Sequence, residues 1–205
     1  FSVRQVLELI KNDENFVYDI DFIPKEGSLA PDTYFVTIGT SAKGFIRRVQ
    51  ATQSSIVHEI WNSKSELFTL ATKEDLIILA SLIEKETSLE AEKREIASVF
   101  LNRLATKMRL QSDATVLYSL TKGAVKLGRK LKISDYRFQS DYNTYLTHGL
   151  PPTAICNPGV KSLVAAANPK KTNFFYFVAD GSGGHVFSRT LEAHNANVRK
   201  YQLKR

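Results

Sequence analysis

The chain has 205 residues, 43% of them hydrophobic and 24% charged, which suits one globular domain, or one domain plus a fragment, with a buried core. Lys and Arg number 28 and Asp and Glu 21, and the resulting net charge of +7 favours polyanionic partners. Because Cys156 is the only cysteine, an intramolecular disulfide, a thiolate metal cluster and a redox pair are excluded. No run of about 18 apolar residues is present, and the chain opens at Phe1 in mid-pattern, so we interpret it as a soluble piece of a longer protein.

The positive charge is spread along the chain and is concentrated only between Lys122 and Lys132. This stretch contains no aromatic residue that could stack on a base, and no known nucleic-acid-binding motif accompanies it. We therefore expect no nucleic-acid partner, and a basic nucleic-acid binder stays open only as an alternative.

Apolar periodicity and capping residues predict a mostly helical chain with one late β-hairpin. Helices are expected over residues 2–11, 41 to about 63, 73 to about 90, 92–107, 160–167 and 191–201. Two strands, over residues 174–179 and 185–188, flank a turn at residues 180–184. Residues 108–160 are irregular and rich in Tyr, Asn and Pro, apart from a short helix suggested over residues 114–120, and so long a stretch favours function. The expected fold class is α+β, with a central helix, an irregular cleft segment and a C-terminal hairpin plus helix.

The helix that starts after Thr72 carries an acid on its apolar side. Thr72 and Asp75 form a variant of the capping box, which fixes the start of this helix. On a helical wheel with Glu86 at zero, Leu79 falls at about 20° and Leu82 at about −40°, whereas Glu84 falls at about 160°. Glu84 is therefore expected to be a solvated charge, and Glu86 to face the core or a cleft.

An ionised carboxylate is costly to bury, so Glu86 is expected either to pair with a cation or to stay protonated with a raised pKa. A protonated carboxyl group against aliphatic side chains is suited to donate a proton to a glycosidic oxygen. The alternative is an ordinary ion pair of Glu86 with Lys93 or Arg94. Geometry alone leaves both interpretations open.

The residues around Glu86 resemble a known enzyme family. The segment Ala80-Ser81-Leu82-Ile83-Glu84-Lys85-Glu86-Thr87 is similar to the motif of the MltG (YceG-like) endolytic murein transglycosylases. Further blocks resemble the family in the same order, at residues 97–104, 108–113, 142–145, 149–152, 157–159, 176–181, 184–185 and 194–195, with residues 26–27 and 31–34 upstream. So long an ordered series is specific.

The resemblance implies the domain organisation and the location of the protein. Residues 1–24 would be the tail of a LysM-like subdomain, and residues 25–205 the YceG-like catalytic domain. The parent protein would be held in the inner (cytoplasmic) membrane by an N-terminal helix that is absent here, with its catalytic domain on the periplasmic, extracytoplasmic side. The implied partners are peptidoglycan glycan strands, with cell-wall synthases of the elongation or division machinery as candidates.

The resemblance also implies a reaction, in which the β-1,4 bond between N-acetylmuramic acid and N-acetylglucosamine of nascent strands is cleaved without water. Glu86, the second acid of the family motif, would protonate the leaving oxygen. It would then accept the proton of the muramic C6 hydroxyl as that oxygen closes a 1,6-anhydro ring. Because one carboxyl group serves both steps, no nucleophilic aspartate, metal or cofactor is implied.

The implied substrate is an acetamido sugar, which calls for amide, hydroxyl and aromatic groups beside the acid. We interpret six residues as candidate substrate-binding residues: Gln111, Ser112, Tyr142, Asn143, Tyr145 and Asn157. The tyrosines could instead belong to the core, and the amide side chains could instead cap loops. Asp113 is expected to cap a helix, and His185 and His194 lack zinc-site spacing and are expected to be structural.

Two further alternatives stay open. A hydrolytic muramidase would use the same site but activate a water molecule. A catalytically inactive glycan-binding module of the division machinery would bind the glycan without cleaving it.

Overall fold

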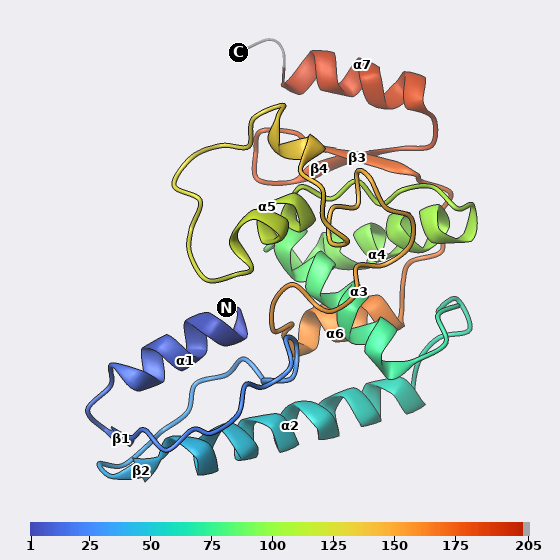
Figure 1. The fold of residues 1–205 in the computed structure, drawn as a ribbon. Helices are drawn as coiled ribbons and strands as arrows, with labels where there is room; N and C mark the ends of the chain where they lie inside the picture. The colour runs from blue at the N-terminus through green and yellow to red at the C-terminus, as the bar shows by residue number, and fades with distance from the viewer. Residues whose placement is uncertain (203–205) are drawn as a thin grey trace.

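The computed structural model describes residues 1–202, in which helices dominate (Figure 1). The helices are α1 (Val3–Lys11), α2 (Ala42–Asn62), α3 (Lys73–Glu86), α4 (Glu90–Ala105), α5 (Asp113–Thr121), the 3-10 turn η1 (Asp135–Arg137), α6 (Val160–Ala167) and α7 (Leu191–Tyr201). The strands are β1 (Phe16–Val17) and β2 (Thr40–Ser41), which pair in parallel, and β3 (Tyr176–Ala179) and β4 (His185–Ser188), which pair antiparallel. The predicted α+β fold with a C-terminal hairpin plus helix is confirmed. None of the helices within residues 1–202 is long and apolar enough to cross a membrane.

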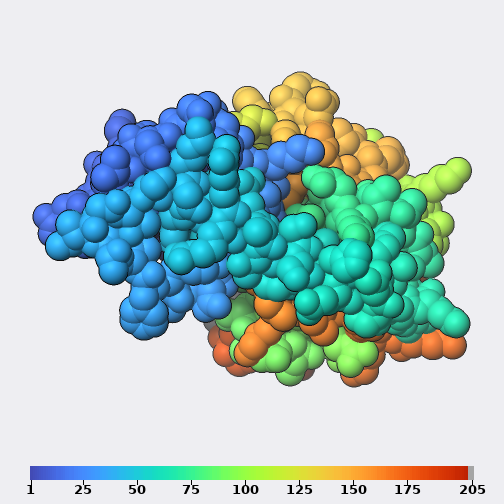
Figure 2. Space-filling model, turned by 90° about the horizontal axis from the view of Figure 1, so that it is seen from below, coloured from blue at the N-terminus to red at the C-terminus, as the bar shows by residue number. Residues whose placement is uncertain are grey.

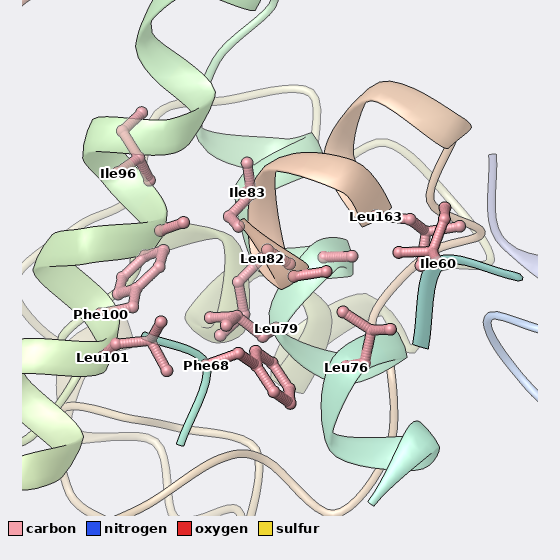
Figure 3. Packing of buried hydrophobic residues seen from close by; sticks show 14 of the residues in the cluster. Ile60, Phe68, Leu76, Leu79, Leu82, Ile83, Ile96, Phe100, Leu101 and Leu163 are labelled. Carbon is pink, nitrogen blue, oxygen red and sulfur yellow. The ribbon is translucent and has the colours of Figure 1, made fainter. Parts of the chain in front are cut away.

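Helix α3 lies at the centre of the main hydrophobic core, between α4 and α6 (Figures 1 and 3). Four of its apolar residues are fully buried and contact apolar side chains of the neighbouring helices: Leu76, Leu79, Leu82 and Ile83 of α3, with Ile96 and Phe100 of α4 and Leu163 of α6. Burial of each such side chain contributes about 1.5 to 3 kcal/mol. The last turn of α3 is therefore held rigidly, and its final residue is Glu86.

The start of α3 was predicted correctly and its end was not. Thr72 and Asp75 form the expected reciprocal capping box. The helix was expected to continue to about residue 90, but it ends at Glu86, because Thr87 adopts an extended conformation with φ −146° and ψ 141°. The Thr87 hydroxyl accepts a hydrogen bond from the backbone of Leu89 at 3.0 Å, a local bond that competes with helix formation. The following helix, α4, begins at Glu90.

The N-terminal residues form a second, smaller core with the first half of α2. Val3 and Ile10 of α1 are buried in one cluster with Leu29, Ala42 and Ile46. Figure 2 shows these blue residues gathered at one end of the molecule, with the cyan atoms of α2 extending from them towards the other end. The expected end of a LysM-like subdomain after residue 24 stays a prediction.

The irregular segment between α4 and α6 contains more regular structure than its composition indicates. Helix α5 covers residues 113–121, as the short helix suggested over residues 114–120 anticipated, and η1 follows a long loop (Figure 1). The glycine-rich turn between β3 and β4 is the expected hairpin, closed by a 2.9 Å hydrogen bond from the Asp180 backbone N–H to the Gly184 carbonyl.

Candidate active site

Glu86 projects from the end of α3 into a cleft of about 500 Å³, the Glu86 cleft. The cleft lies between the core helices and the C-terminal hairpin with α7. Its lining is Glu86, Arg103, Leu110, Gln111, Asp113, Tyr136, Tyr145, Tyr176, Phe177, Val178, Ala179, His185, Leu191, His194, Asn195, Val198 and Gln202. The carboxyl group is thus half-buried, with core side chains behind it and an open, largely polar space before it.

Within residues 1–202, the Glu86 carboxylate has one hydrogen-bond partner, the hydroxyl group of Ser112, which donates to Oε1. Ser112 is itself fixed by the chain around it. Its backbone N–H donates to Oγ1 of Thr144 at 3.1 Å, and the preceding Gln111 N–H donates to the Thr144 carbonyl at 3.1 Å. Gln111 has a φ of 51°, in the left-handed region, and this turn directs the backbone from the cleft into α5.

Burial raises the pKa of the Glu86 carboxyl group above its usual range, and the nearby charge of Asp113 raises it further. The hydrogen bond from Ser112 and the charges of His185 and Arg103 oppose this shift without cancelling it. Glu86 therefore keeps its proton to a higher pH than an exposed glutamate does. A proton-bearing carboxyl group at a cleft wall can act as a general acid.

The alternative ion pair of Glu86 with Lys93 or Arg94 is not formed. The Nζ atom of Lys93 lies 3.7 Å from Oε2 of Glu84 instead and donates to the Thr87 carbonyl at 3.0 Å, while Nε of Arg94 donates to the Asn168 carbonyl. Glu84 was expected to be a solvated charge, and it is so only in part, because it also has partners within the fold. Its side chain is only 36% exposed, and its Oε2 also accepts hydrogen bonds from the Ser162 hydroxyl and the Gly159 N–H.

Three of the six candidate substrate-binding residues lie at the Glu86 cleft. Gln111 and Tyr145 line it, and Ser112 reaches it through its bond to Glu86. Tyr145 donates its hydroxyl to Oδ1 of Asp113 at 2.7 Å and presents its ring edge-on to Tyr136, with the centroids 4.7 Å apart. Tyr145 thus brings an aromatic ring, and Gln111 an amide group, to the lining of the Glu86 cleft.

The other three candidates lie outside the cleft lining. The hydroxyl of Tyr142 bonds Oγ1 of Thr153 at 2.9 Å, and its ring packs on the core beneath the Lys122 ammonium group. Asn143 is fully buried and closes its own loop, donating to the carbonyls of residues 136 and 138 and accepting from the N–H of residue 145. Asn157 accepts from the Leu29 N–H and donates to the Phe1 carbonyl, which ties the N-terminus to the core. The loop-fixing alternatives describe the contacts of the two asparagines.

Several cleft residues were not selected from the sequence as functional candidates. Asp113 accepts from two tyrosine hydroxyls and does not cap α5, contrary to expectation. His185 is oriented by Glu92, whose carboxylate lies 2.8 Å from its Nδ1 and accepts its backbone N–H at 2.8 Å. Arg103 donates to three backbone carbonyls and lies 5.2 Å from the centroid of the Tyr176 ring, which also stacks on His194. His185 and His194 were expected to be structural, yet both also line the cleft.

A second depression also has Glu86 in its lining. This second groove has a volume of about 700 Å³ and lies towards the N-terminus of α6. It is lined by Pro31, Asp32, Glu84, Lys85, Glu86, Thr87, Ser88, Lys93, Gly159, Val160 and Lys161. Glu86 therefore has open space on two sides.

Comparison with known proteins identifies the group to which this arrangement belongs. The sequence model of the YceG-like family matches residues 1–200. The chain belongs to the YceG-like family. The expected resemblance is thereby confirmed, and Glu86 lies within the motif that first indicated it.

Two curated relatives carry the name endolytic murein transglycosylase. The relative from Bacillus subtilis (strain 168) is 40% identical over 179 residues, which cover 87% of this chain and 48% of the relative. The relative from Streptococcus pneumoniae serotype 2 (strain D39) is 31% identical over 183 residues, which cover 86% of this chain and 32% of the relative. The chain thus spans half or less of the length of these relatives.

A solved structure has the same fold. The crystal structure of a putative yceG-like protein from Listeria monocytogenes superimposes with a TM-score of 0.73 at 37% sequence identity, covering 83% of this chain and 54% of that one. The arrangement of helices around α3 is therefore shared with another member of the family.

Proposed function

We propose that this chain is the catalytic part of an endolytic murein transglycosylase, which cleaves the β-1,4 bond between N-acetylmuramic acid and N-acetylglucosamine in nascent peptidoglycan strands. The observation that carries the proposal is the Glu86 carboxyl group, half-buried at a cleft wall with a raised pKa and one neutral hydrogen-bond partner. The names of the relatives at 40% and 31% identity support the same activity.

The reaction follows from one carboxyl group that changes role. Glu86 in its protonated form donates its proton to the glycosidic oxygen as the bond to C1 of the muramic residue breaks. The resulting carboxylate accepts the proton of the C6 hydroxyl of the same residue as the C6 oxygen bonds to C1. The proton lost in the first step is regained in the second, and no water is consumed, so the products are a free 4-hydroxyl and a 1,6-anhydro end.

The groups around Glu86 suit both halves of this cycle. The Ser112 hydroxyl donates to the carboxylate form and orients Oε1. Burial favours the protonated form, so the carboxyl group carries the proton that it donates in the first step. The two forms are therefore each stabilised by a different feature of the site.

The second groove supports cleavage within a strand rather than at its end. A glycan chain that crosses Glu86 would continue on one side along the Glu86 cleft, past Tyr145 and Tyr176, and on the other along the second groove, past Ser88 and Lys161. An enzyme that acts only at chain ends needs a wall on one of these sides, whereas Glu86 borders an open space in both directions.

Digestion of purified sacculi tests the proposal. The full-length protein and its Glu86→Gln variant are incubated with sacculi, and the soluble products are analysed by mass spectrometry. We expect the wild type to release fragments with anhydro ends, which are lighter by one water than reducing ends, and the variant to release almost none. The matched control is Glu74→Gln, which changes an exposed glutamate in the first turn of the same helix and should leave the activity unchanged.

Each alternative predicts a different outcome. Reducing-end products alone would establish a hydrolytic muramidase, and binding to sacculi without release would establish a glycan-binding module. Release by Glu86→Gln at the wild-type rate would refute the assignment of the acid.

We also propose that the parent protein is held in the inner membrane with this domain on the extracytoplasmic side, close to the cell-wall synthases. The support is the family resemblance and the location of the substrate, since peptidoglycan lies outside that membrane. Protease digestion of intact spheroplasts tests this proposal. Degradation of the domain is expected, and protection until lysis would overturn it.

A further inference from the structure

A second acid, Asp113, lies at the Glu86 cleft, and the reaction proposed above does not use it. Asp113 is the first residue of α5 and follows Ser112, whose hydroxyl donates to Glu86. Its side chain lines the same cleft as Glu86 and is exposed to solvent. No lysine or arginine among residues 1–202 forms an ion pair with it, so its charge is not neutralised locally.

Two tyrosines hold the Asp113 carboxylate in place. Tyr145 donates its hydroxyl to Oδ1 at 2.7 Å, and Tyr136 donates its hydroxyl to Oδ2 at 3.2 Å. Each oxygen thus accepts one hydrogen bond, an arrangement that fits the ionised form, in which both oxygens are acceptors. The two rings also pack edge to face, with centroids 4.7 Å apart, so each tyrosine limits the movement of the other.

This arrangement is more specific than a chance surface contact. Tyr136 comes from η1 and Tyr145 from the loop that Asn143 closes, so two separate segments converge on one exposed carboxylate. Exposed carboxylates are satisfied by water and need no such partners. The two hydrogen bonds therefore hold the Asp113 carboxylate in a fixed position relative to Glu86.

We propose that Asp113 is a second functional carboxylate of this site, a positioning residue whose fixed negative charge is held by Tyr136 and Tyr145 beside the reacting group of Glu86. The inference rests on the proposed function. A negative charge beside Glu86 disfavours a second one, so Asp113 helps Glu86 to keep the proton that it donates. The same charge also favours the positive charge that develops at the anomeric carbon as the bond breaks.

The other charged groups that face Glu86 act in the opposite direction. Asp113 raises the pKa of Glu86, whereas His185 from β4 and Arg103 from α4 lower it. Ser112, which directly precedes α5, also lowers it through its hydrogen bond, and burial gives the largest contribution, upwards. Removal of the Asp113 charge would therefore leave burial as the remaining upward contribution against the two cationic groups and the Ser112 hydrogen bond.

The pH profile of cleavage by the full-length protein tests this inference. In Asp113→Asn, the basic limb of the profile, where Glu86 loses its proton, should move to lower pH, by on the order of half a unit to one unit because water screens an exposed charge. Asp113→Glu keeps the charge and should restore the wild-type limb. Asp141→Asn, which removes an exposed aspartate outside the cleft lining, should leave the profile unchanged.

The outcomes separate this inference from the proposed function. If the wild type cleaves sacculi, Glu86→Gln does not, and the basic limb of Asp113→Asn coincides with that of the wild type, then Asp113 is merely structural and the inference fails alone. If Glu86→Gln cleaves as fast as the wild type, the proposed function fails first. A loss of rate in Asp113→Asn without a shift of the limb also contradicts the inference.

Discussion

Glu84 and Glu86 are two residues apart at the end of α3, yet their surroundings are opposite in character. Glu84 faces α6 and lies among donors, with the Lys93 ammonium group at 3.7 Å and the Ser162 hydroxyl and Gly159 N–H as hydrogen-bond partners. Glu86 faces the cleft, and its one hydrogen-bond partner is the neutral Ser112 hydroxyl. A glutamate side chain is thus surrounded by a lysine and two hydrogen-bond donors on one side of the helix. On the other side it lies in a cleft beside a single hydroxyl donor.

The comparison shows that the contacts which hold the end of α3 in place lie on the opposite side of the helix from the Glu86 carboxyl group. Lys93 is almost fully buried, and besides its contact with Glu84 it donates to the Thr87 carbonyl and the Ser162 hydroxyl. These bonds join α4, α6 and the residue directly after Glu86. The ionic side of the helix end therefore fixes the backbone that carries Glu86, while on the other side the Glu86 carboxyl group forms no salt bridge with any residue among 1–202.

Exchange of the two glutamates for glutamine gives the largest expected contrast. Glu86→Gln should lower the rate of glycan cleavage by about 10³-fold, because loss of a general acid costs roughly 10² to 10⁴. Glu84→Gln should retain activity within about tenfold, since an amide still accepts the bonds from Ser162 and Gly159. The rates of soluble-fragment release from sacculi decide this. Equal losses in both variants would show that the two acids act as one unit.

Removal of the buried Lys93 ammonium group should destabilise the fold on the Glu84 side of the helix end. Lys93→Met should lower the free energy of unfolding by about 2 to 3 kcal/mol, below the range for fully buried pairs because Glu84 is 36% exposed. Urea denaturation measures this loss. The control, Lys161→Met, removes an exposed lysine paired with Glu90 and should cost under about 1 kcal/mol. A Lys93→Met variant as stable as this control would contradict the assigned role.

Loss of the Ser112 hydroxyl should have a smaller effect, a shift of the Glu86 pKa in a predictable direction. The Ser112 hydrogen bond lowers the pKa of Glu86, so Ser112→Ala should raise that pKa and move the basic limb of the pH profile to higher pH, by about one unit. The direction is opposite to that expected for Asp113→Asn. Ser119→Ala in the following helix, α5, is the control, since the Ser119 hydroxyl donates to the Thr115 carbonyl of that helix. A limb that moves to lower pH would refute the role of this bond.

The part of this site that could be predicted from the sequence is the part that depends on residue spacing within one helix. The Thr72 cap and the helical period were enough to place Glu86 on the apolar side of α3, because both are properties of one helix. The period could not reveal that Glu84 has partners, since Gly159 and Ser162 lie more than 70 residues later in the chain. A helical wheel describes one helix without its neighbours.

The same limit explains why only some of the predicted substrate-binding residues lie at the cleft. Tyr142, Asn143 and Tyr145 lie within four residues, and composition cannot tell which of them faces the cleft. Hydrogen bonds of the buried Asn143 side chain fix the conformation of this loop. As a result, Tyr145 faces the cleft while Tyr142 packs on the core. Asp113 was interpreted as a cap because its tyrosine partners lie 23 and 32 residues away.

The smallest expected effect concerns stability, and it tests whether burial disfavours the ionised form of Glu86. Because burial raises the pKa of Glu86 in the folded state, the stabilisation from its proton is fully present below the unfolded-state pKa of about 4.3 and is lost as the pH rises through the folded-state pKa. Glutamine cannot ionise. The free energy of unfolding of Glu86→Gln should therefore equal or exceed that of the wild type, with a difference that grows from pH 4 towards neutral pH and then levels off. Urea denaturation of both proteins at pH 4 and pH 8 measures this difference, with the exposed Glu74→Gln as control. A difference that is equal at the two pH values would mean that Glu86 titrates as an exposed glutamate does, and its distinction from Glu84 would then lie in geometry alone.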